Sequence, residues 1–314
     1  MKCVTQRGFT LVELMVVIAI IGILAVALTT LAGKLIDSAR AIRCKANLKA
    51  LAQAAQNYGV SEGHKFPTAG SYEIGHVPRE GGTVPTYSGH RGWVSWTKGN
   101  SDAWPWNSNN RASHKDEMDR ETCYGQKAYI SITNGALWQL VGKDAGVYVC
   151  DAYKSAAQPV FGSGDNNKIY RSYMMSGFFK YNDNNEVKWE DQGGKWSDEV
   201  LKDGKAAVRL AFAELPAQDA RTAADFVDSV VEYEMGGDGY SNSKGESIGF
   251  NHLIAKRWVA HVAFVDGHVE GITLPNKAKK GNGNPDYNHQ DLKDLTGQLC
   301  SGKEIKDEIR ETMR

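Results

Sequence analysis

The sequence has no surplus of charge of either sign, and it lacks the short motifs by which common enzymes are recognised. Lysine and arginine together number 37, as do aspartate and glutamate, in a chain of 314 residues. Such a balance gives no bulk reason to bind nucleic acid. The sequence also contains no Gly-x-Ser-x-Gly, no phosphate-binding loop and no dinucleotide-binding glycine pattern. We therefore expect no enzyme, no nucleic-acid partner and no cofactor.

Charge is absent from a long stretch near the N-terminus. After Glu13, no charged residue occurs before Lys34. As a helix, the segment from Phe9 to Gly33 would extend roughly 37 Å at 1.5 Å per residue, more than a ~30 Å hydrocarbon core. We predict a transmembrane helix over residues 9–33, preceded by a basic leader over residues 1–8. A carboxylate such as Glu13 inside lipid costs on the order of 2.5 kcal/mol or more, so it calls for a partner from another chain.

The helix is expected to continue over residues 34–58 as an amphipathic segment. Apolar residues recur there at steps of three and four, and they form one stripe. The stripe consists of Ala41, Cys44, Leu48, Leu51, Ala55 and Tyr58. It should lie against the rest of the protein, which would bury Cys44, and Gly59 should end the helix.

Cysteines are few. Cys3 lies in the leader, which leaves Cys44, Cys123, Cys150 and Cys300. An even count suits an oxidising compartment, but four cysteines allow three pairings, and four buried free thiols are the alternative.

Residues 59–275 are rich in glycine, asparagine and β-forming runs, which favours one α+β domain with an antiparallel sheet. Strands are expected at 147–150, 171–175, 186–189 and 210–214. Val259–Val265 and His268–Ile272 flank Asp266-Gly267, a pair that predicts a hairpin with a type I′ turn. Residues 276–314 are expected to form a polar tail, with a short charged helix or loose end from Lys303.

A tryptophan- and glycine-rich insertion occupies about residues 70–123. It contains Trp93, Trp96, Trp104 and Trp106. These indoles could stack on sugar rings, although anchoring of a long loop onto the domain is the favoured interpretation.

Two metal sites were weighed from the residues alone. Asp165, Asp183 and Asp238 offer oxygen ligands for calcium, but no segment has the spacing of a known calcium loop. His252, His261 and His268 surround Asp266 without the spacing of a zinc motif, so structural histidines are expected instead.

The N-terminal stretch resembles the signature of type IV pilins and type II secretion pseudopilins. Gly8, Phe9 and Glu13 match that signature position by position. The resemblance implies cleavage between Gly8 and Phe9 by a prepilin peptidase, N-methylation of Phe9 and a role for Glu13 in assembly. An ordinary signal anchor is the alternative, but its cleavage site would follow the apolar stretch rather than precede it.

Further segments resemble a bacterial subfamily of prepilin-like proteins with a large C-terminal domain. They are Arg43–Lys49, Lys65–Pro67, Ile132–Trp138 and Val147–Cys150, the last followed by Asp151 where the subfamily usually has proline. The closing motif is a histidine, nine residues and Asp-Gly. Here His252 stands four residues too far from Asp266-Gly267. We also predict a Cys44–Cys150 disulfide, with Cys123 and Cys300 as a second pair.

The resemblance implies a fibre subunit held in the inner membrane by one helix, with its domain exported to the periplasm. Its expected partners are the prepilin peptidase, other pilin or pseudopilin subunits and an inner-membrane assembly platform. The second hypothesis is an adhesive or glycan-binding minor subunit that uses the tryptophan-rich insertion. An exported enzyme on a pilin-like anchor is a third, less favoured class.

Overall fold

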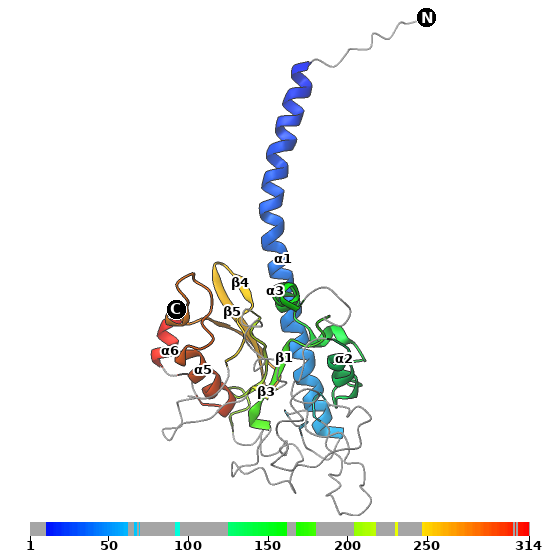
Figure 1. Ribbon diagram of the computed structural model, residues 1–314, viewed down its shortest axis with the longest axis vertical. Coiled ribbons are helices and arrows are strands. Elements are labelled where there is room, and N and C mark those ends of the chain that lie inside the picture. Colours follow the sequence, from blue (N-terminus) through cyan, green and yellow to red (C-terminus); the bar gives the residue numbers. More distant parts are fainter. Residues whose placement is uncertain are drawn as a thin grey trace, which may run out of the picture.

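The computed structural model describes residues 11–61, 66–67, 69, 92–94, 125–161, 168–179, 204–217, 230–231, 247–303, 305 and 307–313. One long helix, α1, projects from a body that contains a mainly antiparallel sheet and several short helices (Figure 1). The expected α+β class is confirmed. The expected strand at 186–189 and the aspartates considered for calcium lie outside the described residues.

Helix α1 (Leu11–Ser61) is continuous over 51 residues. All six members of the predicted apolar stripe, from Ala41 to Tyr58, are buried. The opposite face carries Lys45, Lys49 and Gln53, which are exposed. The amphipathic interpretation is therefore confirmed, although the helix runs two residues past Gly59.

The N-terminal half of α1 projects away from the body as a stalk (Figure 1). The large apolar side chains that the structure describes between Leu11 and Leu28, and that of Leu35, are exposed. In the described part of the chain, no helix has the combination of length and apolar character needed for a membrane crossing. The predicted transmembrane helix over residues 9–33 is therefore not confirmed.

Six strands form one sheet in which β5 is the longest. They are β1 (Tyr173–Ser176), β2 (Leu210–Glu214), β3 (Val230–Val231), β4 (His252–Ile254), β5 (Arg257–Phe264) and β6 (Val269–Thr273). The order is β3-β1-β2-β5-β4, and β6 pairs with the other edge of β5. Strand β4 pairs with the first residues of β5 and β2 with the last, so β2 and β4 lie end to end along one edge.

The hairpin of β5 and β6 is confirmed, but the predicted type I′ turn is wrong. That turn requires positive φ at both central residues, and here only Gly267 has it, at +90°. The amide of Gly267 donates to the carbonyl of Phe264, and the amide of Phe264 donates to the carbonyl of His268. The connection therefore comprises three residues, with glycine in the left-handed conformation at the last of them.

A turn with two positive φ values occurs instead between β4 and β5. Ala255 and Lys256 have φ of +48° and +66°, and Ile254 pairs with Arg257 across them. Neither residue is glycine or asparagine, so this turn could not be predicted from its residue types.

Three helical segments precede β1 in the described part of the chain after α1: α2 (Gly125–Asn134), η1 (Ala145–Tyr148) and α3 (Asp151–Phe161). A further 3-10 turn, η3 (Gly177–Phe179), directly follows β1. The strand expected at 147–150 is therefore wrong, because the carboxylate of Asp144 accepts from the amide of Gly146 and caps a 3-10 turn at this point. Asn47 of α1 holds this segment, because its Nδ2 donates to the carbonyls of Gly146 and Val149.

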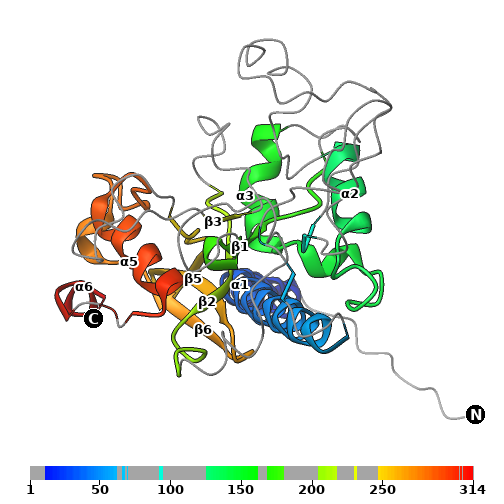
Figure 2. The ribbon, with the colours of Figure 1, turned by 90° about the horizontal axis from the view of Figure 1, so that it is seen from below.

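Residues 276–314 are not the expected polar tail. They form η4 (Asn276–Ala278), α5 (Gln290–Ser301) and α6 (Asp307–Thr312). Leu292, Leu295 and Leu299 are buried, since their spacing places them on one face of α5. Helices α5 and α1 lie on opposite sides of the strands (Figure 2). The C-terminal region therefore completes the hydrophobic core.

Candidate functional site

The processing residues fall at the beginning of the structure. Gly8 and Phe9 lie outside the described residues. Glu13 stands in the first turn of α1 and is exposed. Helix α1 begins at the end of the stalk that points away from the body (Figure 1), so Glu13, for which an assembly role was predicted, lies near that end.

A group of polar side chains is buried where α1 crosses the sheet. The register of the strands brings three of its members into one row. Tyr173 of β1 pairs with Glu214 of β2, and Ala213 of β2 pairs with Val262 of β5. Continuing the second register by one residue places Glu214 opposite His261. Directly opposed residues share one face of a sheet, so Tyr173, Glu214 and His261 project to the same side.

His252 joins this row from β4. It pairs with Val259, two residues before His261 on β5, so both histidines project to the same face. Their ring centroids are 4.3 Å apart. The approach of the chain to the end of β2 depends on Gly249, since an added Cβ would lie 2.2 Å from the carbonyl oxygen of Leu215.

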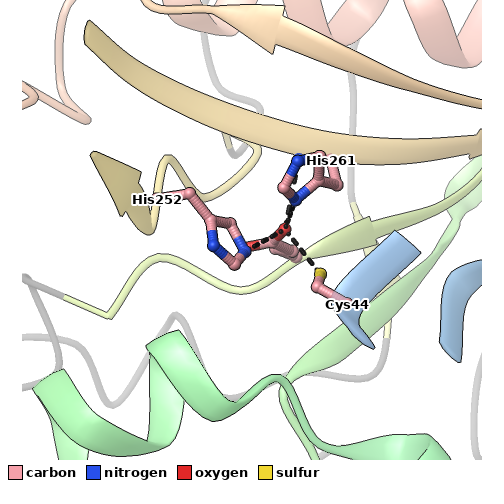
Figure 3. A group of neighbouring side chains, drawn as sticks. Cys44, His252 and His261 are labelled. Carbon is pink, nitrogen blue, oxygen red and sulfur yellow. Dashed lines mark hydrogen bonds and ion pairs between the residues drawn. The ribbon is translucent and has the colours of Figure 1, made fainter. Parts of the chain in front are cut away.

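Cys44 reaches the same point from α1. The side chains of Cys44, His252 and His261 point toward one another from the helix and the sheet (Figure 3). Cys44 Sγ donates to Glu214 Oε1 at 2.9 Å, and His252 Nε2 and His261 Nδ1 each lie 3.1 Å from the same oxygen. Glu214 and His261 are fully buried and His252 nearly so.

Asn251 fixes the other oxygen of the carboxylate. Its Nδ2 donates to Glu214 Oε2 at 2.8 Å and to the carbonyl of Leu215 at 2.8 Å. Its Oδ1 accepts from the amide of Ala217 at 3.0 Å. The amide group of Asn251 is thus held at both ends, and it orients Glu214 toward the histidines.

The electrostatics favour an ionised carboxylate beside a charged histidine. Burial alone would raise the pKa of Glu214, but the charge of His252 and the hydrogen bonds from both histidines hold that pKa well below its ordinary range. Burial would lower the pKa of His252, but the Glu214 charge and the contacts with Cys150 and Glu214 raise it to about 10. Burial raises the pKa of the Cys44 thiol.

The predicted disulfide is not formed. Cys44 and Cys150 are both buried free thiols. They are nevertheless brought to the same place, because Cys150 Sγ lies 3.4 Å from His252 Nε2 and 4.0 Å from Glu214 Oε2. Both thiols also have polar partners in this cluster. Of the suggested second pair, Cys300 is buried in α5 and Cys123 lies outside the described residues.

Sequence reasoning identified some of these residues and missed the one that joins them. Cys44 was singled out by itself, and His252 and His261 were grouped with His268 around Asp266. His268 instead packs on the ring of Phe264 and contacts Asp266 at the hairpin tip. Glu214 was overlooked as the end of an apolar strand. The sequence does contain one sign of this site, because Glu214 is the only charged residue of the apolar strand Leu210–Glu214. A charged side chain buried with such a strand requires a polar partner.

Of the other predicted sites, only two reach the described residues. Trp93 is fully buried, stacked on Tyr148 and edge-on to Phe212, which fits the anchoring interpretation. Trp96, Trp104 and Trp106 lie outside the described residues. At the Asp266-Gly267 tip, the side-chain amide of Gln56 donates to the carbonyl of Val265 at 2.7 Å and ties the hairpin to α1.

Comparison with known proteins bears on the N-terminal region. Residues 4–29 match the family model described as the prokaryotic N-terminal methylation motif. No curated protein and no solved structure shows significant similarity to the chain. The matched span includes Gly8, Phe9 and Glu13, the residues on which the resemblance was based. Over residues 4–29, the chain therefore carries the signature of type IV pilins and pseudopilins.

Proposed function

We propose that the protein is a structural subunit of a type IV pilus-like fibre or a type II secretion pseudopilus. The observation that carries the proposal is the match of residues 4–29 to the methylation motif. The division of α1 supports it. The C-terminal half of this helix buries one face against the body, and the N-terminal half carries exposed apolar side chains between Leu11 and Leu28 and at Leu35.

An exposed apolar surface of this length marks a site of contact with other protein chains or with a membrane. In the proposed function, the N-terminal halves of α1 from several subunits pack against one another in the core of the fibre. Before assembly, the same segment would be held in the inner membrane, with the domain exported to the periplasm. The fibre subunits and an inner-membrane assembly platform are the partners that this arrangement implies.

Processing would precede assembly. A prepilin peptidase would cut between Gly8 and Phe9, and the new amine of Phe9 would be methylated. Glu13 would then pair with the Phe9 amine of a neighbouring subunit. A subunit out of axial register would leave a buried charge unpaired, at a cost of about 3–5 kcal/mol, so pairing selects the register.

Mass spectrometry of the mature N-terminus tests the processing step. The expected product begins at a methylated Phe9. Recovery of an intact Met1 from cells with an active prepilin peptidase would contradict the proposal.

The effect of Glu13→Val on fibre formation tests assembly. The measurement is the ratio of sheared fibre to membrane-bound subunit. We expect this ratio to fall at least tenfold while cleavage at Gly8 and the folded domain are retained. Asp37→Val removes an exposed carboxylate on α1 outside the matched span and serves as the control. An unchanged ratio in Glu13→Val would remove the role of Glu13 in register.

The adhesive alternative gains no support from Trp93, whose buried indole cannot stack on a sugar. The remaining tryptophans of the insertion, Trp96, Trp104 and Trp106, lie outside the described residues.

A further inference from the structure

We propose that Cys44, Glu214, His252 and His261 bind one divalent transition-metal ion of the zinc class between α1 and the sheet. Each residue offers one ligand atom to the group, and these four atoms lie within 4.8 Å of one another. Thiolate, imidazole and carboxylate are the ligands that zinc takes in proteins. The proposal concerns the interior of the body and is independent of the proposed function.

The spacing of the ligand atoms suits a tetrahedral ion. Zinc bonds of 2.0–2.3 Å place the ligand atoms of a tetrahedron about 3.3–3.8 Å apart. Cys44 Sγ lies 2.9 Å from Glu214 Oε1, and each histidine nitrogen lies 3.1 Å from it. Shifts of a few tenths of an ångström in these contacts, and a contraction of the widest, would bring all four atoms to bonding distance.

Hydrogen bonding does not account for the way these groups converge. Four groups approach Glu214 Oε1: Cys44 Sγ, His252 Nε2, and the Nδ1 and backbone amide of His261. A carboxylate oxygen has about two lone-pair sites, so it can accept good hydrogen bonds from two of them. An ion at the centre would instead use a lone pair from the thiolate, from each imidazole and from the carboxylate.

The charges also balance. With the metal bound, a thiolate and a carboxylate neutralise a divalent ion, and both histidines are neutral ligands. The site then buries no net charge, which is the condition for placing ions in a protein interior.

Two neighbouring side chains have the positions expected of residues that orient metal ligands. Asn251 Nδ2 donates at 2.8 Å to Oε2 of Glu214, the carboxylate oxygen that Cys44 and the histidines do not contact. Tyr173 Oη donates to Cys44 Sγ at 3.4 Å. Such contacts fix the direction of ligand lone pairs. Cys150 Sγ stands beside His252 as an adjacent thiol.

Burial of all four ligands indicates a structural site. A catalytic metal keeps one position open to solvent, whereas closed four-ligand sites hold elements together. Here the ligands come from α1, β2, β4 and β5, so the ion would fasten the long helix to three strands. It would provide the cross-link for which a disulfide was predicted.

Metal analysis of the full-length chain, purified in detergent under reducing conditions without chelator, tests the proposal. We expect about one zinc per chain. After removal of the metal, addition of Co²⁺ alone should give the visible bands of tetrahedral cobalt and a near-ultraviolet thiolate-to-cobalt band. The wild-type spectrum is informative even if a variant fails to fold, because the second band requires a cysteine ligand.

Substitutions inside and outside the proposed ligand set test where the ion binds. Cys44→Ser should abolish the thiolate-to-cobalt band, and His252→Gln should lower the metal content to background. Cys300→Ser and His268→Gln change a buried cysteine and a histidine outside the cluster, and they should retain one metal per chain. Tyr173→Phe, which keeps the ring, should weaken cobalt affinity about tenfold.

Three outcomes would overturn the proposal. One is a wild-type chain that carries no metal and gives no cobalt bands. Another is a thiolate band that persists in Cys44→Ser. The third is a Cys44–Cys150 disulfide in protein isolated with its thiols blocked at lysis, because it would remove the proposed sulfur ligand.

Discussion

Glu214 and His261 lie opposite each other on β2 and β5, and a single carboxylate oxygen of Glu214 contacts both the ring and the backbone amide of His261 at 3.1 Å. Both side chains are fully buried. The register of the sheet thus sets a carboxylate against a histidine beneath α1, in the centre of the body.

Removal of the Glu214 charge should strongly destabilise the body. In the metal-free protein, Glu214→Gln leaves His252 buried without its counter-ion, and loss of one partner of such a pair costs about 3–5 kcal/mol. The matched control is Glu270→Gln on β6, whose carboxylate is 61% exposed beside His268. The control should change stability by less than about 0.5 kcal/mol. Urea unfolding monitored by tryptophan fluorescence measures both, and equal effects would contradict the interpretation of the cluster.

Substitutions in the two hairpin turns should change the free energy of unfolding in opposite directions. Lys256→Gly should stabilise the body by about 1 kcal/mol, because a non-glycine residue in the left-handed region carries strain of that order. Gly267→Ala should destabilise it by a similar amount, since it introduces the same strain and places a Cβ 3.3 Å from the amide of Gln56. The shift in thermal midpoint checks both. Stabilisation by Gly267→Ala would refute the assignment of the turn.

These turns show where sequence reasoning succeeds and where it fails. The β-forming runs Val259–Val265 and His268–Ile272 on either side of Asp266-Gly267 identified the hairpin, because strand and turn preferences are local information. The turn geometry depends on how the two strands pair across their ends, so Asp-Gly alone could not choose between a two-residue and a three-residue connection. The turn at Ala255-Lys256 had no signature, because tertiary contacts impose a conformation that its residues do not prefer.

The stripe of α1 was predictable for the same local reason, whereas the buried cluster was not. Glu214 and His261 are 47 positions apart, and Cys44 is 170 positions from Glu214. Glu214 and His261 come together because β2 pairs with β5, and Cys44 joins them because α1 crosses the sheet at this point. No spacing rule along the chain contains that information.

Helix α5 was not predicted from the sequence, because polar residues separate its leucines. The structure predicts that Leu295→Ala in α5 costs about 2–5 kcal/mol, the range for truncating a leucine in a packed core. Leu253→Ala on β4 is the control, since Leu253 is 49% exposed and should change stability by less than about 0.5 kcal/mol. Equal small effects in urea unfolding would restore the polar-tail interpretation of residues 276–314.

Tyr148 and Tyr173 provide a matched pair for the last prediction, because both rings are buried and their hydroxyls differ in hydrogen bonding. Tyr173 Oη donates to Cys44 Sγ, whereas Tyr148 Oη has no hydrogen-bond partner among the described residues. A buried, unsatisfied hydroxyl costs about 1–3 kcal/mol. Tyr148→Phe should therefore raise the free energy of unfolding by about 1 kcal/mol, and Tyr173→Phe should lower it by about 1 kcal/mol.

The response to pH distinguishes this effect from a simple change in packing. Burial raises the pKa of Tyr148 above its ordinary value, so the folded protein keeps a proton that the unfolded chain releases above about pH 10. The contribution of Tyr148 to stability is thus intact below pH 10 and declines as the pH rises further. Phenylalanine has no proton to lose, so the advantage of Tyr148→Phe over wild type should widen above pH 10. Unfolding free energies measured at pH 7 and pH 10.5 provide the comparison. A difference that stays constant between the two would mean that the hydroxyl is hydrated or bonded in the folded protein.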